Sequence, residues 1–108
     1  MSVVELTSIE EIDSFIEINP LSMLYVSQED CNVCHAIYPK LKTMLKLYPK
    51  LALARVNASQ VEEITGRFLI FSVPTILIFL DGREYLREGR FVQFEQLKKQ
   101  LQLLSDEV

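Results

Sequence analysis

Residues that ligate metals or carry redox chemistry are scarce in this sequence, which has two cysteines, one histidine and no tryptophan among 108 residues. A structural zinc site needs about four ligands. Only Cys31, Cys34 and His35 offer a thiolate or an imidazole, so we expect no metal site within one chain and no bound cofactor. A zinc site shared by two chains stays open, because the second chain would supply the missing ligands.

The sequence also has no excess of basic residues, no long apolar run and no recognisable export signal. Its formal net charge is −4, which gives no reason to expect nucleic-acid binding. The longest apolar stretch, Phe68–Leu80, is interrupted by Ser72, Pro74 and Thr75 and is too short to span a bilayer. Residues 1–5 lack the basic and apolar regions of a signal peptide. We therefore expect a cytoplasmic protein without membrane contact, where a Cys-x-x-Cys pair is more often redox-active or metal-binding than structural.

Hydrophobic periodicity and turn residues predict alternating strands and helices within a single domain, residues 1–108. The strands are predicted at Val3–Leu6, Leu21–Val26, Leu51–Val56, Ser72–Leu80 and Arg83–Glu88. The helices are predicted between Ser8 and Asn19, at Asn32–Tyr48, from Ser59 to near Gly66, and from Phe94 to Leu104. Two capping boxes, Ser8 with Glu11 and Ser59 with Glu62, are expected to begin the first and third helices.

The resulting order, βαβαβαββα, is typical of an α/β fold with a parallel core and right-handed crossovers. The turn Asp81-Gly82 predicts a hairpin that adds antiparallel strands at one side. In the last strand we expect Tyr85 on one face and Glu84 and Leu86 on the other. Five phenylalanines are expected to pack in the core: Phe68, Phe71, Phe79, Phe91 and Phe94. For Phe71 the alternative is an exposed side chain that contacts the substrate.

Both cysteines lie in the stretch Cys31-Asn32-Val33-Cys34-His35, which opens the second predicted helix. Cysteines at i and i+3 share one face of the first helical turn, so their sulfurs can bond to each other or share a metal. The helix start directs N–H groups and the positive end of its dipole at Cys31, which favours the thiolate. The pattern by itself fits dithiol–disulfide exchange, metal binding and c-type haem attachment. The absence of an export signal and the position in a βα unit argue against haem.

With the order of elements in place, the chain resembles the thioredoxin family over nearly its full length. The residues that carry the resemblance are Cys31-Asn32-Val33-Cys34 between a strand and a helix, Pro39 kinking that helix, Val73-Pro74-Thr75 opening the fourth strand, Asp81-Gly82, and Gly89 before the last helix. The resemblance implies a mixed four- to five-stranded sheet flanked by helices. It also implies that Cys31 is the exposed nucleophile and Cys34 the resolving thiol. The Val73–Pro74 bond is then expected to be cis, with Val73 pairing through its backbone with an extended substrate.

The residues that tune the cysteines in thioredoxins are replaced here. Asp30 stands where the family usually has tryptophan, and Asn-Val replaces Gly-Pro between the cysteines. Tyr25 aligns with the buried acid that helps to deprotonate the resolving thiol, and Arg55 aligns with a lysine that partners this acid. His35 either favours a thiolate when protonated or has no role. Nearby negative charge from Asp30 opposes the thiolate of Cys31.

The resemblance implies a thiol–disulfide oxidoreductase that reduces protein disulfides and is reset by an electron donor such as a thioredoxin reductase or a small thiol. We expect disulfide-containing proteins as partners, and neither nucleic acid nor membrane. With Tyr25 in place of an acid, we expect slower resolution of mixed disulfides. The alternative is a thioredoxin-fold binding or redox-sensing module with little turnover.

Overall fold

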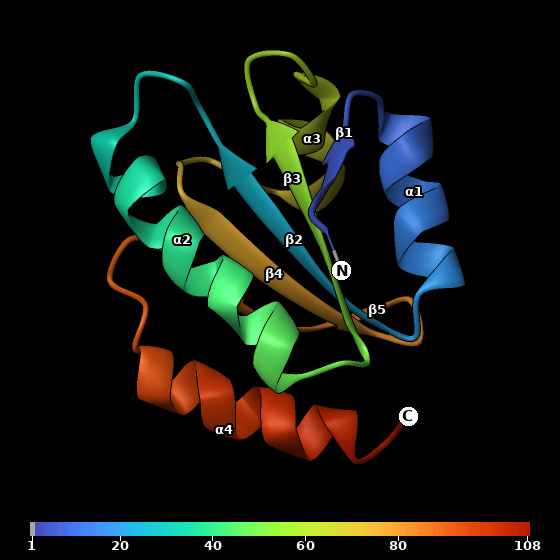
Figure 1. Cartoon of the computed structure of the whole chain (residues 1–108). Coiled ribbons are helices and arrows are strands. Elements are labelled where there is room, and N and C mark those ends of the chain that lie inside the picture. The colour runs from blue at the N-terminus through green and yellow to red at the C-terminus, as the bar shows by residue number, and fades with distance from the viewer. Residues whose placement is uncertain (1) are drawn as a thin grey trace.

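The computed structural model describes residues 2–108 and has its helices and strands in the order predicted from the sequence. Figure 1 shows a central sheet with helices on both sides. The strands are β1 (Val4–Leu6), β2 (Leu21–Ser27), β3 (Leu51–Asn57), β4 (Thr75–Leu80) and β5 (Arg83–Glu88). The helices are α1 (Ile9–Ile18), α2 (Asn32–Leu47), α3 (Glu63–Phe68) and α4 (Phe94–Ser105).

The strands form one mixed sheet in the order β1-β3-β2-β4-β5. β1, β3 and β2 are parallel, whereas β4 is antiparallel to both β2 and β5. The last pair of β2 and β4 joins Val26 to Thr75. The residues that enter β4, including Pro74, therefore lie at the same end of the sheet as the residues that leave β2 toward Cys31. The mixed sheet is confirmed, and its topology brings the two sequence motifs to one end.

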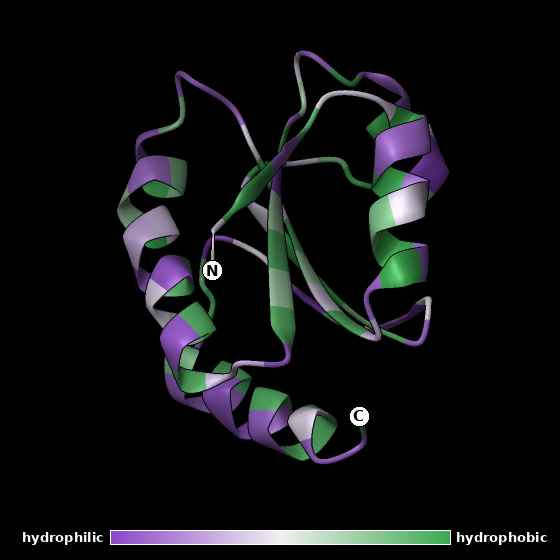
Figure 2. Ribbon diagram, turned by 45° about the vertical axis from the view of Figure 1, so that its right-hand side comes forward, coloured by the Kyte–Doolittle hydropathy of each residue, from purple (hydrophilic) through white to green (hydrophobic). Residues whose placement is uncertain are grey.

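Each face of the sheet has its own hydrophobic core, covered by its own pair of helices. Side chains alternate along a strand, so Met23 and Tyr25 of β2 join the core beneath α2 and α4, while Leu24 and Val26 join the core beneath α1 and α3. In Figure 2 the helices carry green, hydrophobic segments between purple, hydrophilic ones. This is the pattern of helices that bury one face and expose the other.

The beginnings of α1 and α2 are largely as predicted. The Ser8 hydroxyl accepts a hydrogen bond from the Glu11 amide at 3.2 Å and caps α1. In a capping box the Glu11 carboxylate would accept from the backbone N–H of Ser8. Here it accepts from the backbone N–H of Thr7, one residue earlier, at 2.7 Å. α2 begins at Asn32, contains Pro39 and ends one residue before the predicted end.

The predicted capping box at Ser59 is wrong. The Asn57 side chain accepts from the Ser59 amide at 2.9 Å, and this turn holds Ser59 ahead of the helix. α3 begins only at Glu63 and has no side-chain cap. It also continues past Gly66 to Phe68, and Leu69 ends it in the left-handed conformation with φ 56°. A leucine takes the backbone position that glycine usually fills.

β4 is shorter than predicted, because residues 72–74 form a loop ahead of it. The Thr75 hydroxyl donates to the Ser72 carbonyl at 2.7 Å within this loop. Pro74 has no N–H to give to a strand ladder, and β4 starts at Thr75. Of the phenylalanines, Phe79 is buried, whereas Phe71 and Phe91 are 81% and 84% exposed. The expectation that these two pack in the core is therefore wrong, and for Phe71 the alternative of exposure is confirmed.

β5 contains a bulge that changes which of its side chains share a face. Ile78 pairs with Leu86 and the next residue, Phe79, pairs with Glu84, so Tyr85 is the extra residue of the bulge. Since Ile78 and Phe79 point to opposite faces of β4, so do their partners Leu86 and Glu84. The prediction that Glu84 and Leu86 share a face is therefore wrong.

Candidate active site

Cys31 and Cys34 lie where β2 passes into α2, and they are joined by a disulfide with their Cα atoms 5.2 Å apart. Cys31 is the N-cap residue of the helix and is half-buried, whereas Cys34 is only 1% exposed. The Cys31 sulfur caps the helix, because it accepts a hydrogen bond from the Cys34 amide at 3.1 Å. The more accessible cysteine of the pair is thus the one that precedes the helix.

The position of Cys31 stabilises negative charge on its sulfur once the disulfide is opened. The Cys34 amide that now donates to this sulfur would then donate to a thiolate, and the positive end of the α2 dipole adds to the effect. Glu29 and Asp30 are exposed just ahead of Cys31 and act in the opposite direction. Their solvent exposure reduces their influence, because water screens exposed charges.

His35 is placed by a contact with the loop before Cys31. Its Nε2 lies 2.6 Å from the Glu29 carbonyl oxygen, which makes Nε2–H the donor. The side chain is exposed and ties the first turn of α2 to residue 29. The structure therefore gives His35 a hydrogen bond to the loop backbone, and none to either sulfur is seen within residues 2–108.

Tyr25 lies beneath the disulfide with its side chain 1% exposed. Its hydroxyl donates to the Cys34 carbonyl oxygen at 2.7 Å. Burial raises the pKa of Tyr25 to about 12, and the charge of Arg55 lowers it by a smaller amount. The phenol therefore keeps its proton at neutral pH and directs it at a backbone oxygen, so Tyr25 does not act as an ionised acid.

Arg55 lies beside Tyr25 on the neighbouring strand β3. Tyr38 of α2 stacks on Tyr25 with ring centroids 6.0 Å apart and planes 9° from parallel. The guanidinium of Arg55, on β3, lies 4.3 Å from the Tyr38 ring centroid. The Arg55 Nε donates to the two oxygens of the Glu5 carboxylate at 2.9 and 3.1 Å. Glu5 is next to Arg55 in the β1–β3 register, and Arg55 is next to Tyr25 in the β2–β3 register. The charge of Arg55 is thus balanced by Glu5, its neighbour on β1.

The Val73–Pro74 peptide bond is cis, and Pro74 is buried at the entrance to β4. Val73 is half-buried and packs against both cores, and it contacts the same α2-side core as Cys31. A side chain at Gly89 would come within 3.8 Å of the Pro74 carbonyl oxygen, so the start of the segment before α4 runs beside this loop. The exposed ring of Phe71 precedes the loop by two residues.

The structure thus brings Cys31, Cys34 and Tyr25 together, directs the ring of His35 from α2 to the Glu29 carbonyl and places Arg55 beside Tyr25 on β3. Sequence reasoning missed Tyr38 and Glu5, which complete the stack. The cross-strand position of Glu5 would become visible only from the register of β1 on β3.

No three His, Cys, Asp or Glu side chains gather in residues 2–108 in a way that could hold a metal ion. Over that same part of the chain, none of the helices combines the length and apolar character needed to cross a bilayer.

Comparison with known proteins places this geometry in a family. The family model for Thioredoxin matches residues 3–103. Thioredoxin-like protein YdfQ of Bacillus subtilis (strain 168) is 46% identical over 96 residues, which cover 89% of this chain and 86% of that protein. Thioredoxin 1 of Plasmodium falciparum (isolate 3D7) is 33% identical over 76 residues, or 70% of this chain and 73% of that protein.

Solved structures give the same answer at the level of the fold. A thioredoxin from Plasmodium falciparum has a TM-score of 0.83 at 28% identity, covering 94% of this chain and 98% of that chain. A mutant thioredoxin from Halobacterium salinarum NRC-1 has a TM-score of 0.88 at 16% identity, covering 96% and 91%. Family, fold and a disulfide-bonded Cys-x-x-Cys pair together support thiol–disulfide oxidoreductase activity. The chain belongs to the thioredoxin family.

Proposed function

We propose that this protein reduces protein disulfides by thiol–disulfide exchange, with Cys31 as nucleophile and Cys34 as resolving thiol. The observation that carries the proposal is the asymmetry of the pair. Cys31 is half-buried and its sulfur accepts a backbone N–H, whereas Cys34 is fully buried. An attacking sulfur must be accessible to the substrate and exist as a thiolate. A resolving sulfur needs no access to the substrate, because it attacks the neighbouring Cys31 sulfur.

In the reductive direction the Cys31 thiolate attacks one sulfur of a substrate disulfide. The substrate S–S bond breaks, its second sulfur leaves as a thiolate and takes a proton, and a mixed disulfide forms at Cys31. Cys34 loses its proton and attacks the Cys31 sulfur. The mixed disulfide breaks, and the substrate sulfur that was bound to Cys31 leaves as a thiolate and takes a proton. The protein has then given two electrons to the substrate and holds the Cys31–Cys34 disulfide. A thioredoxin reductase or a small thiol supplies two electrons to open it again.

Val73 and Pro74 are the proposed substrate-binding residues. They lie at the end of the sheet where α2 begins, and the half-buried Val73 contacts the same core as Cys31. An extended substrate segment would pair with the Val73 backbone and hold its disulfide over Cys31. Backbone pairing tolerates many side chains, which suits an enzyme that acts on several protein disulfides.

Tyr25 limits the second step in this scheme. Cys34 must lose a proton before it attacks, and a buried group with a pKa near neutral would accept it best. Tyr25 stays protonated, because burial raises its pKa to about 12. Solvent then accepts the proton of Cys34, and resolution is slower than it would be with a carboxylate at position 25. Asp30, His35 and Arg55 are proposed to have smaller tuning effects through charge or loop position.

We place this chemistry in the cytoplasm and within one domain, residues 1–108. Both cysteines of the chain belong to the motif, so no second pair is present for a structural disulfide within the chain. A dithiol that cycles in a reducing compartment needs no such framework.

The second candidate function is a binding or redox-sensing module with little turnover. The observation that favours it is Tyr25, since a slow second step leaves the partner attached at Cys31. Reduction of insulin by dithiothreitol, with and without the protein, separates the two functions. The reductase predicts acceleration that is lost in Cys31→Ser. No acceleration by a protein whose two thiols titrate normally would favour the module.

A further inference from the structure

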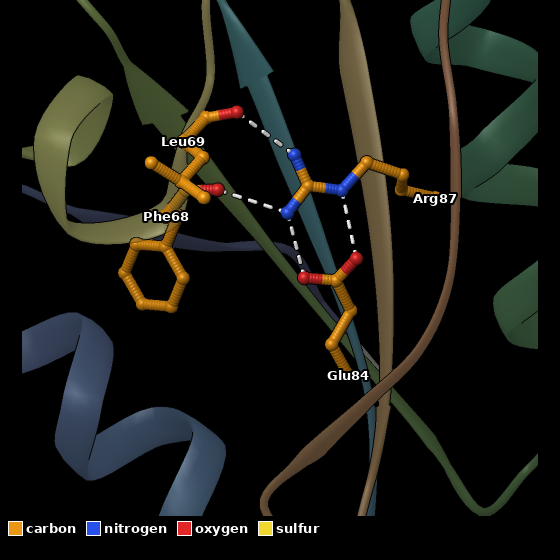
Figure 3. Close-up of polar contacts among 4 residues, drawn as sticks. All are labelled: Phe68, Leu69, Glu84 and Arg87. Atoms are coloured by element: carbon orange, nitrogen blue, oxygen red, sulfur yellow. Dashed lines mark hydrogen bonds and ion pairs between the residues drawn. The ribbon is translucent and has the colours of Figure 1, made fainter.

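Arg87 makes an unusual set of contacts on the face of the sheet opposite the α2-side core. Its Nη1 donates to the Leu69 carbonyl at 2.9 Å and its Nη2 donates to the Phe68 carbonyl at 2.8 Å. Its Nε and Nη2 also donate to the two oxygens of Glu84, each at 2.7 Å. Figure 3 shows the guanidinium between the Glu84 carboxylate and the two carbonyls. We call these four residues, Phe68, Leu69, Glu84 and Arg87, the Arg87 clamp.

The clamp exists because of the bulge in β5. In a regular strand, residues three apart point to opposite faces. The extra residue Tyr85 restores Glu84 and Arg87 to one face, where they pair in register with Phe79 and Leu77 of β4. Both of these β4 residues belong to the α1/α3-side core. The bulge therefore aims a bidentate ion pair at the end of α3.

The clamp meets a need that α3 has at its C-terminus. The last carbonyls of a helix have no partner within the helix, and they carry its partial negative charge. α3 is six residues long, and it ends at Leu69 with φ 56°, a left-handed conformation that costs a residue with a Cβ atom energy. An arginine fork binds two carbonyls and a carboxylate at once, so it holds both the helix end and the left-handed residue.

The segment that follows Leu69 leads directly to the proposed substrate-binding residues. Ile70 is buried, Phe71 is 81% exposed, and Val73 and Pro74 come next. The Ile70 amide donates back to the Thr65 carbonyl at 3.0 Å, which ties the segment to α3. Fixing the end of α3 therefore also fixes the direction in which the segment enters the site.

From these contacts we infer that Arg87, held by Glu84, is a positioning residue that fixes the end of α3 and thereby sets the substrate-pairing segment 70–74. Arg87 does not touch the cysteines, and it acts through the backbone of Phe68 and Leu69. The effect on substrates rests on the proposed function, whereas the effect on the segment does not.

The test compares R87K and E84Q with the control R83K. Lysine keeps the charge but replaces the planar fork with a single ammonium group. Arg83 is on the same strand and exposed, and it makes no side-chain hydrogen bond within residues 2–108, so R83K repeats the change outside the clamp. Two quantities are measured: amide hydrogen exchange residue by residue, and steady-state kinetics with insulin and with a small aromatic disulfide.

In R87K the Leu69 and Ile70 amides should exchange about tenfold faster, the size expected for lost hydrogen bonds to a charged group, while β2 amides keep their protection. KM for insulin should rise by about threefold to tenfold with kcat nearly unchanged, because a misplaced segment weakens substrate binding. Kinetics with the small disulfide should not change, since it does not need the segment. E84Q should show the same changes to a smaller extent, and R83K none.

Unchanged exchange at Leu69 and Ile70 in R87K would overturn the inference. So would an equal loss of protection in β2, because Arg87 would then only stabilise the whole fold. If the wild-type protein reduced neither disulfide, the proposed function would fail. The amide hydrogen-exchange rates alone would then decide whether the clamp holds the segment. If it reduced both, and R87K left the insulin KM unchanged, the positioning role would fail while the proposed function stood.

Discussion

The hydroxyl of Tyr25 donates to the backbone carbonyl of Cys34 at 2.7 Å, beneath the disulfide and out of contact with solvent. Tyr25 aligns with the buried acid of thioredoxins, and its phenol keeps its proton at neutral pH. It fixes the first turn of α2 by hydrogen bonding and at the same time removes a proton acceptor from the neighbourhood of Cys34. Tyr25 thus contributes to the structure of the site and, in the proposed mechanism, to the rate of its chemistry.

The stability of the protein should depend on alkaline pH through Tyr25. Its pKa is raised from 10.0 to about 12 by burial, so folding favours the protonated phenol. The corresponding stability is fully present below the ordinary tyrosine pKa and is lost as the pH rises through the folded value. Urea unfolding between pH ~9 and ~12 should show a fall in the free energy of unfolding that is shallower in Tyr25→Phe.

Tyr38→Phe is the matched control for this measurement, because Tyr38 lies in the same stack and its hydroxyl makes no hydrogen bond within residues 2–108. Its pH dependence should follow that of the wild type. The same alkaline slope in the wild type and in Tyr25→Phe would contradict the role given to the buried phenol.

Replacing Tyr25 by aspartate should speed the second step of exchange. A carboxylate beneath Cys34 accepts its proton, and a positioned base contributes about a hundredfold or more at best. We expect resolution of a preformed mixed disulfide at Cys31 to be about tenfold faster in Tyr25→Asp, measured by stopped flow. Burial raises the pKa of such a carboxyl, so the gain should grow as the pH rises.

Tyr25→Asn is the control for this experiment, since it makes the same cavity and has a similar shape without a titratable group. Its resolution rate should stay near that of the wild type. Equal rates in Tyr25→Asp and Tyr25→Asn would show that proton transfer to residue 25 does not limit the step.

The two thiols should differ in reactivity once the protein is reduced. Cys31 is half-buried at the start of α2 and its sulfur accepts an amide N–H, whereas Cys34 is fully buried. Alkylation by iodoacetamide near pH ~7, followed by peptide mass analysis, should label Cys31 at least about tenfold faster. The difference should vanish in urea, where both thiols are exposed. Faster labelling of Cys34 in the folded protein would reverse the assigned roles.

The sequence was sufficient to predict the elements and the motif, because these depend on local patterns. Hydrophobic spacing predicted the order of strands and helices, and the spacing of Cys31 and Cys34 predicted a pair at a helix start. The cap at Ser8 was predicted for the same reason, since it depends on four consecutive residues. The box at Ser59 failed because the Asn57 side chain competes for the same amide.

The arrangement around the cysteines could not be predicted in this way, because it depends on register across several strands. Glu5, Arg55 and Tyr25 are far apart in the sequence and become neighbours only when β1, β3 and β2 are aligned. Glu84 and Arg87 are three residues apart and would face opposite sides of a regular strand. The bulge at Tyr85 reverses this, and the sequence contains no glycine there to indicate a bulge.

The most direct test of the account is the capture of a substrate by Cys34→Ser. The reduced variant is mixed with insulin, the products are separated without reductant, and their molecular masses are measured by mass spectrometry. The expected product is a covalent adduct of the protein and one insulin molecule, linked through Cys31 and absent from the wild type and from Cys31→Ser. Failure of Cys34→Ser to form this adduct, while its remaining thiol still reacts with iodoacetamide, would contradict exchange through Cys31.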